Sequence, residues 1–151
     1  MSDAVRSSPT SGAAGSGPAS GAAGSGPAGD EITAPWWEAT REGRLLLQCC
    51  LACGHTQHYP RALCTGCGGT DLGWRESAGR GSVDSYTVVH RSPSPEHPAP
   101  YVVARVRLDE GPVLLTNLIG ATDWRCDQRV RLAWRELDDG RRLPVFVSDP
   151  P

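Results

Sequence analysis

Five of the six cysteines lie between positions 49 and 67, and four of them have the spacing of a metal site. Cys50/Cys53 and Cys64/Cys67 are two C-x-x-C pairs, each followed by a glycine that accepts the positive φ of a tight turn. Four thiolates complete a tetrahedral zinc site that is closed to water, and such a site is structural rather than catalytic. The pattern therefore predicts one structural Zn²⁺ per chain, held by Cys50, Cys53, Cys64 and Cys67.

Neighbouring residues leave alternative ligands open. Cys49 could replace Cys50 with three residues between the sulfurs, although the two-residue spacing followed by glycine makes the better knuckle. His55 and His58 could replace a thiol, but four thiols already fill the site. The distant Cys126 is interpreted as a free thiol. A disulfide framework and a thioredoxin-type redox pair fit less well, because no export signal is visible and both pairs are followed by glycine.

A short helix and a strand are predicted to lead into the first cysteine pair, within the segment APWWEATREGRLLLQ. Pro35 is suited to the first turn of a helix, Gly43 ends it, and residues 45–47 read as a strand. Two adjacent tryptophans on so short a helix cannot both face a small core. We therefore expect one of Trp36 and Trp37 to pack on the chain itself and the other to bind a partner, where Trp is a favoured anchor.

Beyond Gly79 the apolar residues recur with a period of two, which is typical of strands. In the first strand the alternation places Val83, Ser85, Thr87 and Val89 on one face, with Tyr86 and Val88 on the other. Five such strands without a convincing helix between them predict a mainly β protein, in which a helix and a four-cysteine zinc ribbon precede a small OB-fold Greek-key barrel. The predicted strands are residues 81–91, 101–108, 113–119, 129–136 and 143–147.

Composition divides the chain into three predicted parts. Residues 1–29 repeat the nonapeptide SGAAGSGPA and are expected to form a disordered linker; residues 30–76 hold the helix and a rubredoxin-like ribbon, and residues 77–151 the barrel. The formal net charge of −2 supplies no obvious basic stripe for nucleic acid. No apolar stretch is long enough for a membrane span, and no export signal is visible, so we expect a cytoplasmic protein without a membrane partner.

Short motifs, taken in order, resemble the zinc-ribbon/OB-fold family once catalogued as domain of unknown function thirty-five. The resemblance covers nearly the whole predicted folded unit and departs from the family at Cys49, where another residue is usual. The matching pieces are Trp36-Trp37-Glu38, GRLLLQCC at 43–50, Cys53-Gly54, Tyr59-Pro60-Arg61, Cys64, Cys67-Gly68, GRGSV at 79–83, YTVVH at 86–90 and LDEG at 108–111.

Members of that family accompany acyl-CoA enzymes of the thiolase superfamily, and some are fused to or paired with hydratase-like hot-dog domains. The resemblance implies a non-catalytic accessory subunit that binds a thiolase-fold enzyme and helps to form its acyl-CoA site, in lipid, steroid or polyketide metabolism. Acyl-CoA would then be shared with the partner. Trp36 and Trp37 are the expected partner-binding residues, no catalytic residue is expected, and Arg44, Arg61 or Arg105 could reach the partner's acids or the CoA phosphates.

Two other functions stay open at this point. Zinc ribbons and OB folds also bind nucleic acid, with Tyr86 and Tyr101 as stacking platforms and Arg105 and Arg107 on phosphates, although the acidic balance argues against this function. A self-sufficient enzyme would need a base such as His90. A lone histidine on a strand is more often a packed or solvated residue than a catalytic one.

Overall fold

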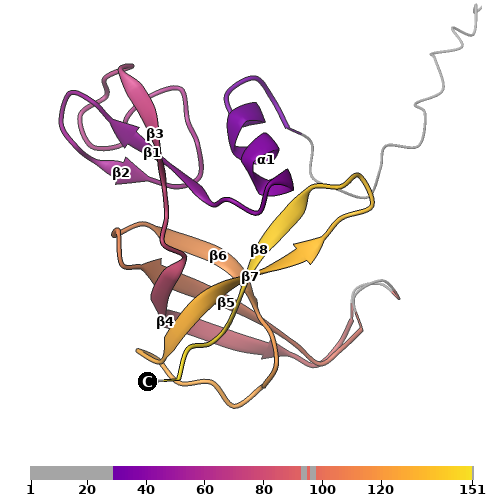
Figure 1. Ribbon diagram of the computed structural model, residues 1–151. Helices are drawn as coiled ribbons and strands as arrows, with labels where there is room; N and C mark the ends of the chain where they lie inside the picture. The colour runs from indigo at the N-terminus through magenta and orange to yellow at the C-terminus, as the bar shows by residue number, and fades with distance from the viewer. Residues whose placement is uncertain (1–28, 93–94, 96–97, 151) are drawn as a thin grey trace, which may run out of the picture.

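The computed structural model describes residues 29–92, 95 and 98–150, so nearly all of the predicted linker lies outside the described residues. A three-stranded sheet and one helix sit side by side above a closed barrel (Figure 1). The mainly β architecture predicted from the sequence is confirmed. In chain order the elements are α1 (Ala34–Arg41), β1 (Leu46–Cys50), β2 (Thr56–Gln57), β3 (Leu72–Glu76), β4 (Arg80–Val89), β5 (Tyr101–Leu108), β6 (Val113–Leu118), β7 (Arg129–Glu136) and β8 (Arg142–Ser148).

Helix α1 begins and ends where the sequence predicts. Pro35 lies in its first turn, and Gly43 takes a φ of 74° just beyond its end. The expectation that one of its two tryptophans stays on the surface is wrong, because Trp36 is 3% exposed and Trp37 is 6% exposed. The helix is covered by the ribbon on one side and by the barrel on another, so both indoles are buried within the chain.

The two tryptophans pack against different regions. Trp36 contacts the rings of His58 and Tyr59 from the loop after β2, with centroids 5.6 and 5.5 Å away. Trp37 lies under the guanidinium of Arg141 near the start of β8, 4.4 Å from its ring centroid. Helix α1 thus joins the ribbon to the barrel.

The ribbon sheet has the order β2-β1-β3, with both neighbours antiparallel to β1. Its central strand β1 ends at Cys50, so the strand delivers the first cysteine directly to the turn that follows. A short connection, from Ser77 to Gly79, leads from β3 into the barrel.

The barrel closes in the order β4-β5-β6-β8-β7: β7 and β8 form an antiparallel hairpin, β7 pairs with β4, and β8 pairs with β6. Alternate residues of β5 are buried, in keeping with the period-two pattern of this segment: Val102, Ala104, Val106 and Leu108. The same apolar cluster includes Phe146 of β8 and also Trp36, Trp37, Leu45 and Leu47 from outside the barrel. One continuous core therefore holds α1, the start of β1 and the barrel together.

The predicted faces of the first barrel strand are wrong beyond Val83. The register of β4 against β5 shifts between Val83 and Ser85, which is the mark of a β-bulge. After that shift Val88 lies opposite the buried Val102 and packs against the core, whereas Thr87 lies opposite the half-buried Val103. One extra residue reverses the alternation, and a period-two pattern cannot reveal it.

Candidate metal centre and partner groove

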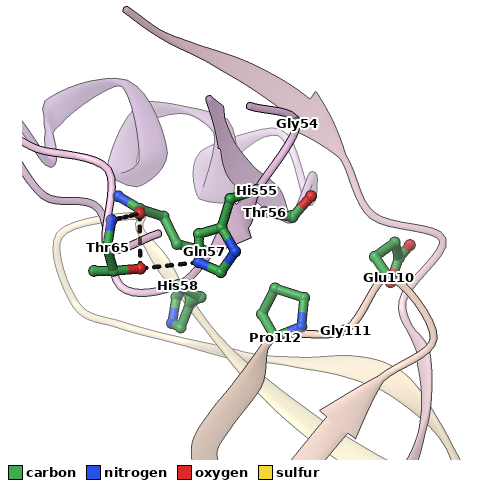
Figure 2. A pocket seen from close by; sticks show the side chains of 9 residues that line it. All are labelled: Gly54, His55, Thr56, Gln57, His58, Thr65, Glu110, Gly111 and Pro112. Carbon is green, nitrogen blue, oxygen red and sulfur yellow. Dashed lines mark hydrogen bonds between the residues drawn. The ribbon is translucent and has the colours of Figure 1, made fainter. Parts of the chain in front are cut away.

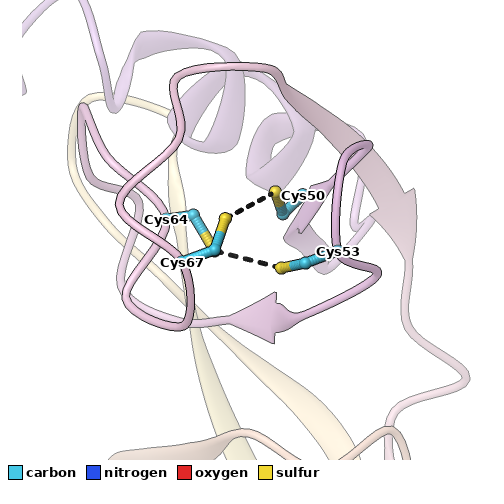
Figure 3. A group of neighbouring side chains, drawn as sticks. All are labelled: Cys50, Cys53, Cys64 and Cys67. Carbon is cyan, nitrogen blue, oxygen red and sulfur yellow. Dashed lines mark hydrogen bonds between the residues drawn. The ribbon is translucent and has the colours of Figure 1, made fainter.

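The four cysteines predicted as ligands come together at one point of the ribbon. Their sulfurs face one another from the two turns (Figure 3), and all four lie within 4.8 Å of one another. The Sγ atoms of Cys50 and Cys67 are 3.7 Å apart, as are those of Cys53 and Cys64. Zinc–sulfur bonds of about 2.3 Å place tetrahedral sulfurs roughly 3.8 Å apart, so the cluster has the dimensions that zinc requires.

The two turns that carry the cysteines have the same backbone geometry. Gly54 and Gly68 have φ values of 74° and 75°, and their N–H groups donate to the carbonyl oxygens of Cys50 and Cys64 at 2.8 and 2.9 Å. A side chain at either position would be strained at such a φ, which is why glycine follows each pair. The sequence rule for the knuckle is therefore visible twice in the structure.

The second turn also favours the charged form of its first cysteine. Backbone N–H groups of Cys67 and Gly66 point toward the Cys64 sulfur, with Gly66 N at 3.3 Å, and they lower the pKa of the Cys64 thiol to about 6. Metal ligation requires the thiolate, and these N–H groups favour that form at Cys64. The ligand roles of the four cysteines stay a prediction that this geometry supports.

The alternative ligands lie apart from the cluster. The Cys49 sulfur contacts the Cys50 carbonyl, and Cys126 is exposed on the barrel. His55 bonds through Nε2 to the Thr65 hydroxyl at 2.9 Å. His58 turns toward α1 instead, where burial lowers its pKa to about 4.

Two buried glutamines that the sequence analysis did not single out hold the loop between the knuckles in place. Gln57 Nε2 donates to Gln48 Oε1 at 2.6 Å, and the same oxygen accepts the Arg61 N–H at 3.0 Å. Gln57 Oε1 accepts the Thr65 N–H at 2.8 Å. The two residues lie opposite each other on β1 and β2. The sequence feature that could have identified them is a glutamine in each of two neighbouring strands, at positions where a buried residue is expected.

A cleft of about 470 Å³ separates the ribbon from the β5–β6 turn of the barrel (Figure 2). On the ribbon side Thr65 is hydrogen-bonded to both His55 and Gln57. On the barrel side Glu110 accepts the Ala78 N–H at 2.7 Å, which ties the turn to the connection after β3. The second carboxylate oxygen of Glu110, Oε2, is buried without a hydrogen-bond partner in the described part of the chain. Because the other polar groups serve contacts within the chain, the cleft is interpreted as the joint between the two regions.

A second cavity, an apolar groove of about 290 Å³, is lined by residues of α1, of the loop after β2 and of the barrel strands β6, β7 and β8. Trp36, Tyr59 and Leu115 are among its walls, and Arg135 is its one charged lining residue once His58 is neutral. The indole N–H groups of both tryptophans are buried without an acceptor in the described part of the chain. Trp36 and Trp37 thus form an inner wall of the groove and do not project as anchors, and their predicted part in partner binding stays a prediction.

Three of the arginines considered for CoA or nucleic acid are paired with carboxylates of the chain itself. Arg44 pairs with Glu76 and Glu42, while Arg105 and Arg107 both pair with Asp84. The single carboxylate of Asp84 thereby balances one of the two positive charges on the outer face of β5, which weakens the case for a phosphate-binding surface there. None of the helices in the described part of the chain has the length and apolar character needed to cross a membrane.

Comparison with known proteins identifies both regions. Residues 37–73 match the family model described as "ChsH2, rubredoxin-like zinc ribbon domain", and residues 74–135 match "ChsH2, C-terminal OB-fold domain". Among solved structures, the chain is similar to one described as "Ltp2-ChsH2(DUF35) aldolase", with 42% identity and a TM-score of 0.75 over 81% of this chain and 98% of that one. A protein of unknown function of the DUF35 family from Sulfolobus solfataricus is 16% identical over 79% of this chain and 86% of that one, with a TM-score of 0.59, and shows the fold alone.

Two curated relatives are longer than the region they share with this chain. A "Probable enoyl-CoA hydratase alpha subunit" of Thermomonospora curvata is 43% identical over 118 residues, which are 77% of this chain and 37% of the relative. A "DUF35 domain-containing scaffold protein" of Pyrococcus furiosus is 34% identical over 84 residues, which are 55% of this chain and 62% of the relative. The chain thus spans about a third of the first relative and about three fifths of the second.

Proposed function

Because this chain belongs to the ChsH2-type zinc-ribbon/OB-fold (DUF35) family, we propose that it is a non-catalytic accessory subunit of an acyl-CoA enzyme of the thiolase superfamily. The partner owns the reacting groups, and this chain binds beside its acyl-CoA entrance and helps to form that site. The observation that carries the proposal is the similarity, over 81% of the chain, to a structure described as an Ltp2-ChsH2(DUF35) aldolase.

The ribbon has a structural part in this function. Cys50, Cys53, Cys64 and Cys67 would hold one Zn²⁺, whose chemistry is to cross-link two loops that have little apolar core of their own. The chain's own residues then set the shape: Gln48 and Gln57 fix the loop between the knuckles, and that loop places His58 and Tyr59 against α1.

A hydratase-like partner is the second candidate. The Thermomonospora curvata relative is named as a hydratase subunit, and the region similar to this chain is about a third of its length. Its remaining length leaves room for a hydratase domain, as in the hot-dog fusions that the resemblance implies. In this chain the corresponding partner would be a separate protein or a separate domain.

Co-expression with thiolase-superfamily and hydratase-like proteins encoded near this chain's gene tests the proposal. We expect one complex to co-purify, with acyl transfer or carbon–carbon cleavage lost when this chain is omitted and no acyl-CoA turnover by this chain alone. A partner that turns over at full rate by itself, together with no complex on a sizing column at micromolar concentration, would contradict the accessory function. Turnover of acyl-CoA by the isolated chain would contradict its non-catalytic character.

A further inference from the structure

The groove under α1 combines apolar walls with one arginine that has no ion pair in the described part of the chain. Leu115 on the outer face of β6 is 76% exposed, the most exposed of the large apolar residues in the described part of the chain. Tyr59, 38% exposed, belongs to the same groove, and the buried Trp36 lies against the Tyr59 ring. A single exposed leucine is ordinary. A leucine beside aromatic side chains in a groove instead forms a contiguous apolar surface, and such surfaces often mark interaction sites.

The charge at the edge is Arg135 of β7. It lies opposite Leu143 of β8, another wall of the groove, and it has no ion pair among the residues that the structure describes. The neighbouring Arg142, by contrast, pairs with Glu136. The other ionisable side chain with a basic character, His58, is neutral near pH 7 because burial lowers its pKa to about 4. The groove therefore presents one positive charge beside an apolar surface.

From this combination, and resting on the proposed accessory function, we propose that the groove receives an apolar side chain of the acyl-CoA enzyme, with a nearby carboxylate of that enzyme paired to Arg135. An apolar anchor in a pocket with a charged pair at its edge is the usual construction of a specific protein interface. The bidentate geometry of a guanidinium with a carboxylate adds orientation to that contact.

The dimensions favour a protein segment over a bound acyl chain. Small-molecule sites have volumes of about 300–1,000 Å³ and enclose most of the ligand surface. This groove, at about 290 Å³, lies at the lower limit of that range, and the wide exposure of Leu115 shows that it is open on one side. An open groove of this size suits one or two side chains from a surface that closes over it.

Leu115→Asp and Arg135→Glu test the groove, and the chain offers matched controls for both. Ile119→Asp introduces the same charge in place of an exposed aliphatic residue just beyond β6, and Arg131→Glu reverses a charge on the same strand and outer face as Arg135. None of the four side chains is buried, so thermal melting of each variant should match the wild-type chain. Affinity for the co-expressed acyl-CoA enzyme is measured by calorimetry with the full chain.

We expect each groove variant to weaken the complex at least tenfold and each control to leave it within about twofold. A wild-type complex that tolerates both groove variants would overturn this assignment and leave the accessory function intact. No complex with the wild-type chain would overturn both. Titration of the isolated chain with decanoyl-CoA, followed by tryptophan fluorescence, provides the remaining outcome: quenching that Leu115→Asp abolishes would assign the groove to an acyl chain and overturn the docking proposal.

Discussion

The ribbon and the barrel are stabilised by different means within one short chain. Among the buried residues of the ribbon are Cys50, Cys64, Gln48 and Gln57, so its interior is largely sulfur and amide groups. The barrel interior is aliphatic and aromatic, with Val83, Val106, Val130 and Phe146 fully buried. The difference teaches that a region too small to bury a core can still have a defined shape when a metal site and a buried hydrogen-bond network replace apolar packing.

One apolar core extends across the boundary between the two regions. Leu47 of β1 and both tryptophans of α1 belong to the same cluster as the barrel residues. Helix α1 is therefore stabilised together with the barrel although it precedes the ribbon in the sequence. The predicted boundary at 76/77 stays a prediction about the chain's organisation, and the packing crosses it.

Loss of the metal centre should have the largest effect and should fall on the ribbon. Cys64→Ser removes one of four ligands, and structural zinc contributes on the order of 10 kcal/mol to the folding of comparable small domains. We expect loss of bound zinc and loss of amide protection over β1–β3, with most protection retained in β5 and β6. Elemental analysis and hydrogen exchange measure the two results.

Cys126→Ser is the matched control, because Cys126 is exposed on the barrel and outside the sulfur cluster. It should keep both the metal and the protection pattern. Soluble, folded wild-type protein that contains no metal would contradict the prediction.

A cavity in the barrel should have the next largest effect. It should destabilise the barrel and leave the metal site of the ribbon intact. Phe146→Ala empties a fully buried position, and such truncations cost about 3–5 kcal/mol. We expect a lower urea midpoint while the folded fraction keeps one zinc per chain. If zinc release shifted to lower urea together with the barrel transition, the two regions would not be stabilised independently.

The pH dependence of stability should report on the contact between the ribbon loop and α1. The pKa of His58 is about 4 in the folded chain and 6.5 in a model peptide, so between these values the unfolded chain binds a proton that the folded chain excludes. The contribution of neutral His58 is therefore fully present above pH 6.5 and is lost as the pH falls toward 4. With about 1.4 kcal/mol per pKa unit as an upper limit, we expect roughly 1–3 kcal/mol.

His58→Phe separates this effect from acid release of the metal, because the variant keeps an aromatic ring next to Trp36 but cannot titrate. The free energy of unfolding, measured from pH 7 to pH 4.5, should fall less in the variant than in the wild-type chain. Equal slopes would show that His58 is accessible to protons in the folded state.

The smallest effect is expected from the charges on the barrel surface. Arg129 donates two hydrogen bonds to Asp109, at 2.8 and 2.7 Å, and lowers the pKa of that carboxyl. Both side chains are about half exposed, and exposed ion pairs contribute little once salt screens them. Asp109→Asn should leave the melting temperature at 0.15 M salt close to that of the wild-type chain, and a large decrease would show that this pair locks the β5–β6 turn.

Local patterns in the sequence determined much of the molecule. The two C-x-x-C-G motifs predicted which four sulfurs meet, because a knuckle is fixed by residues within one turn of chain. Strands β5 and β7 were predicted with their observed limits, since alternating burial is a property of each strand alone. Helix α1 was predicted from Pro35 and Gly43 for the same reason.

Only the tertiary structure decided the features that depend on two distant segments. The burial of both Trp36 and Trp37 depends on partners from the loop after β2 and from the start of β8, which no local pattern brings together. The bulge in β4 appears only in its register with β5. The groove likewise joins Tyr59, Leu115 and Arg135 from three separate elements. The spacing of residues along the chain determines the geometry within a turn or a strand. A surface formed by several elements depends instead on how those elements are positioned relative to one another, and the packing of the whole core sets those positions.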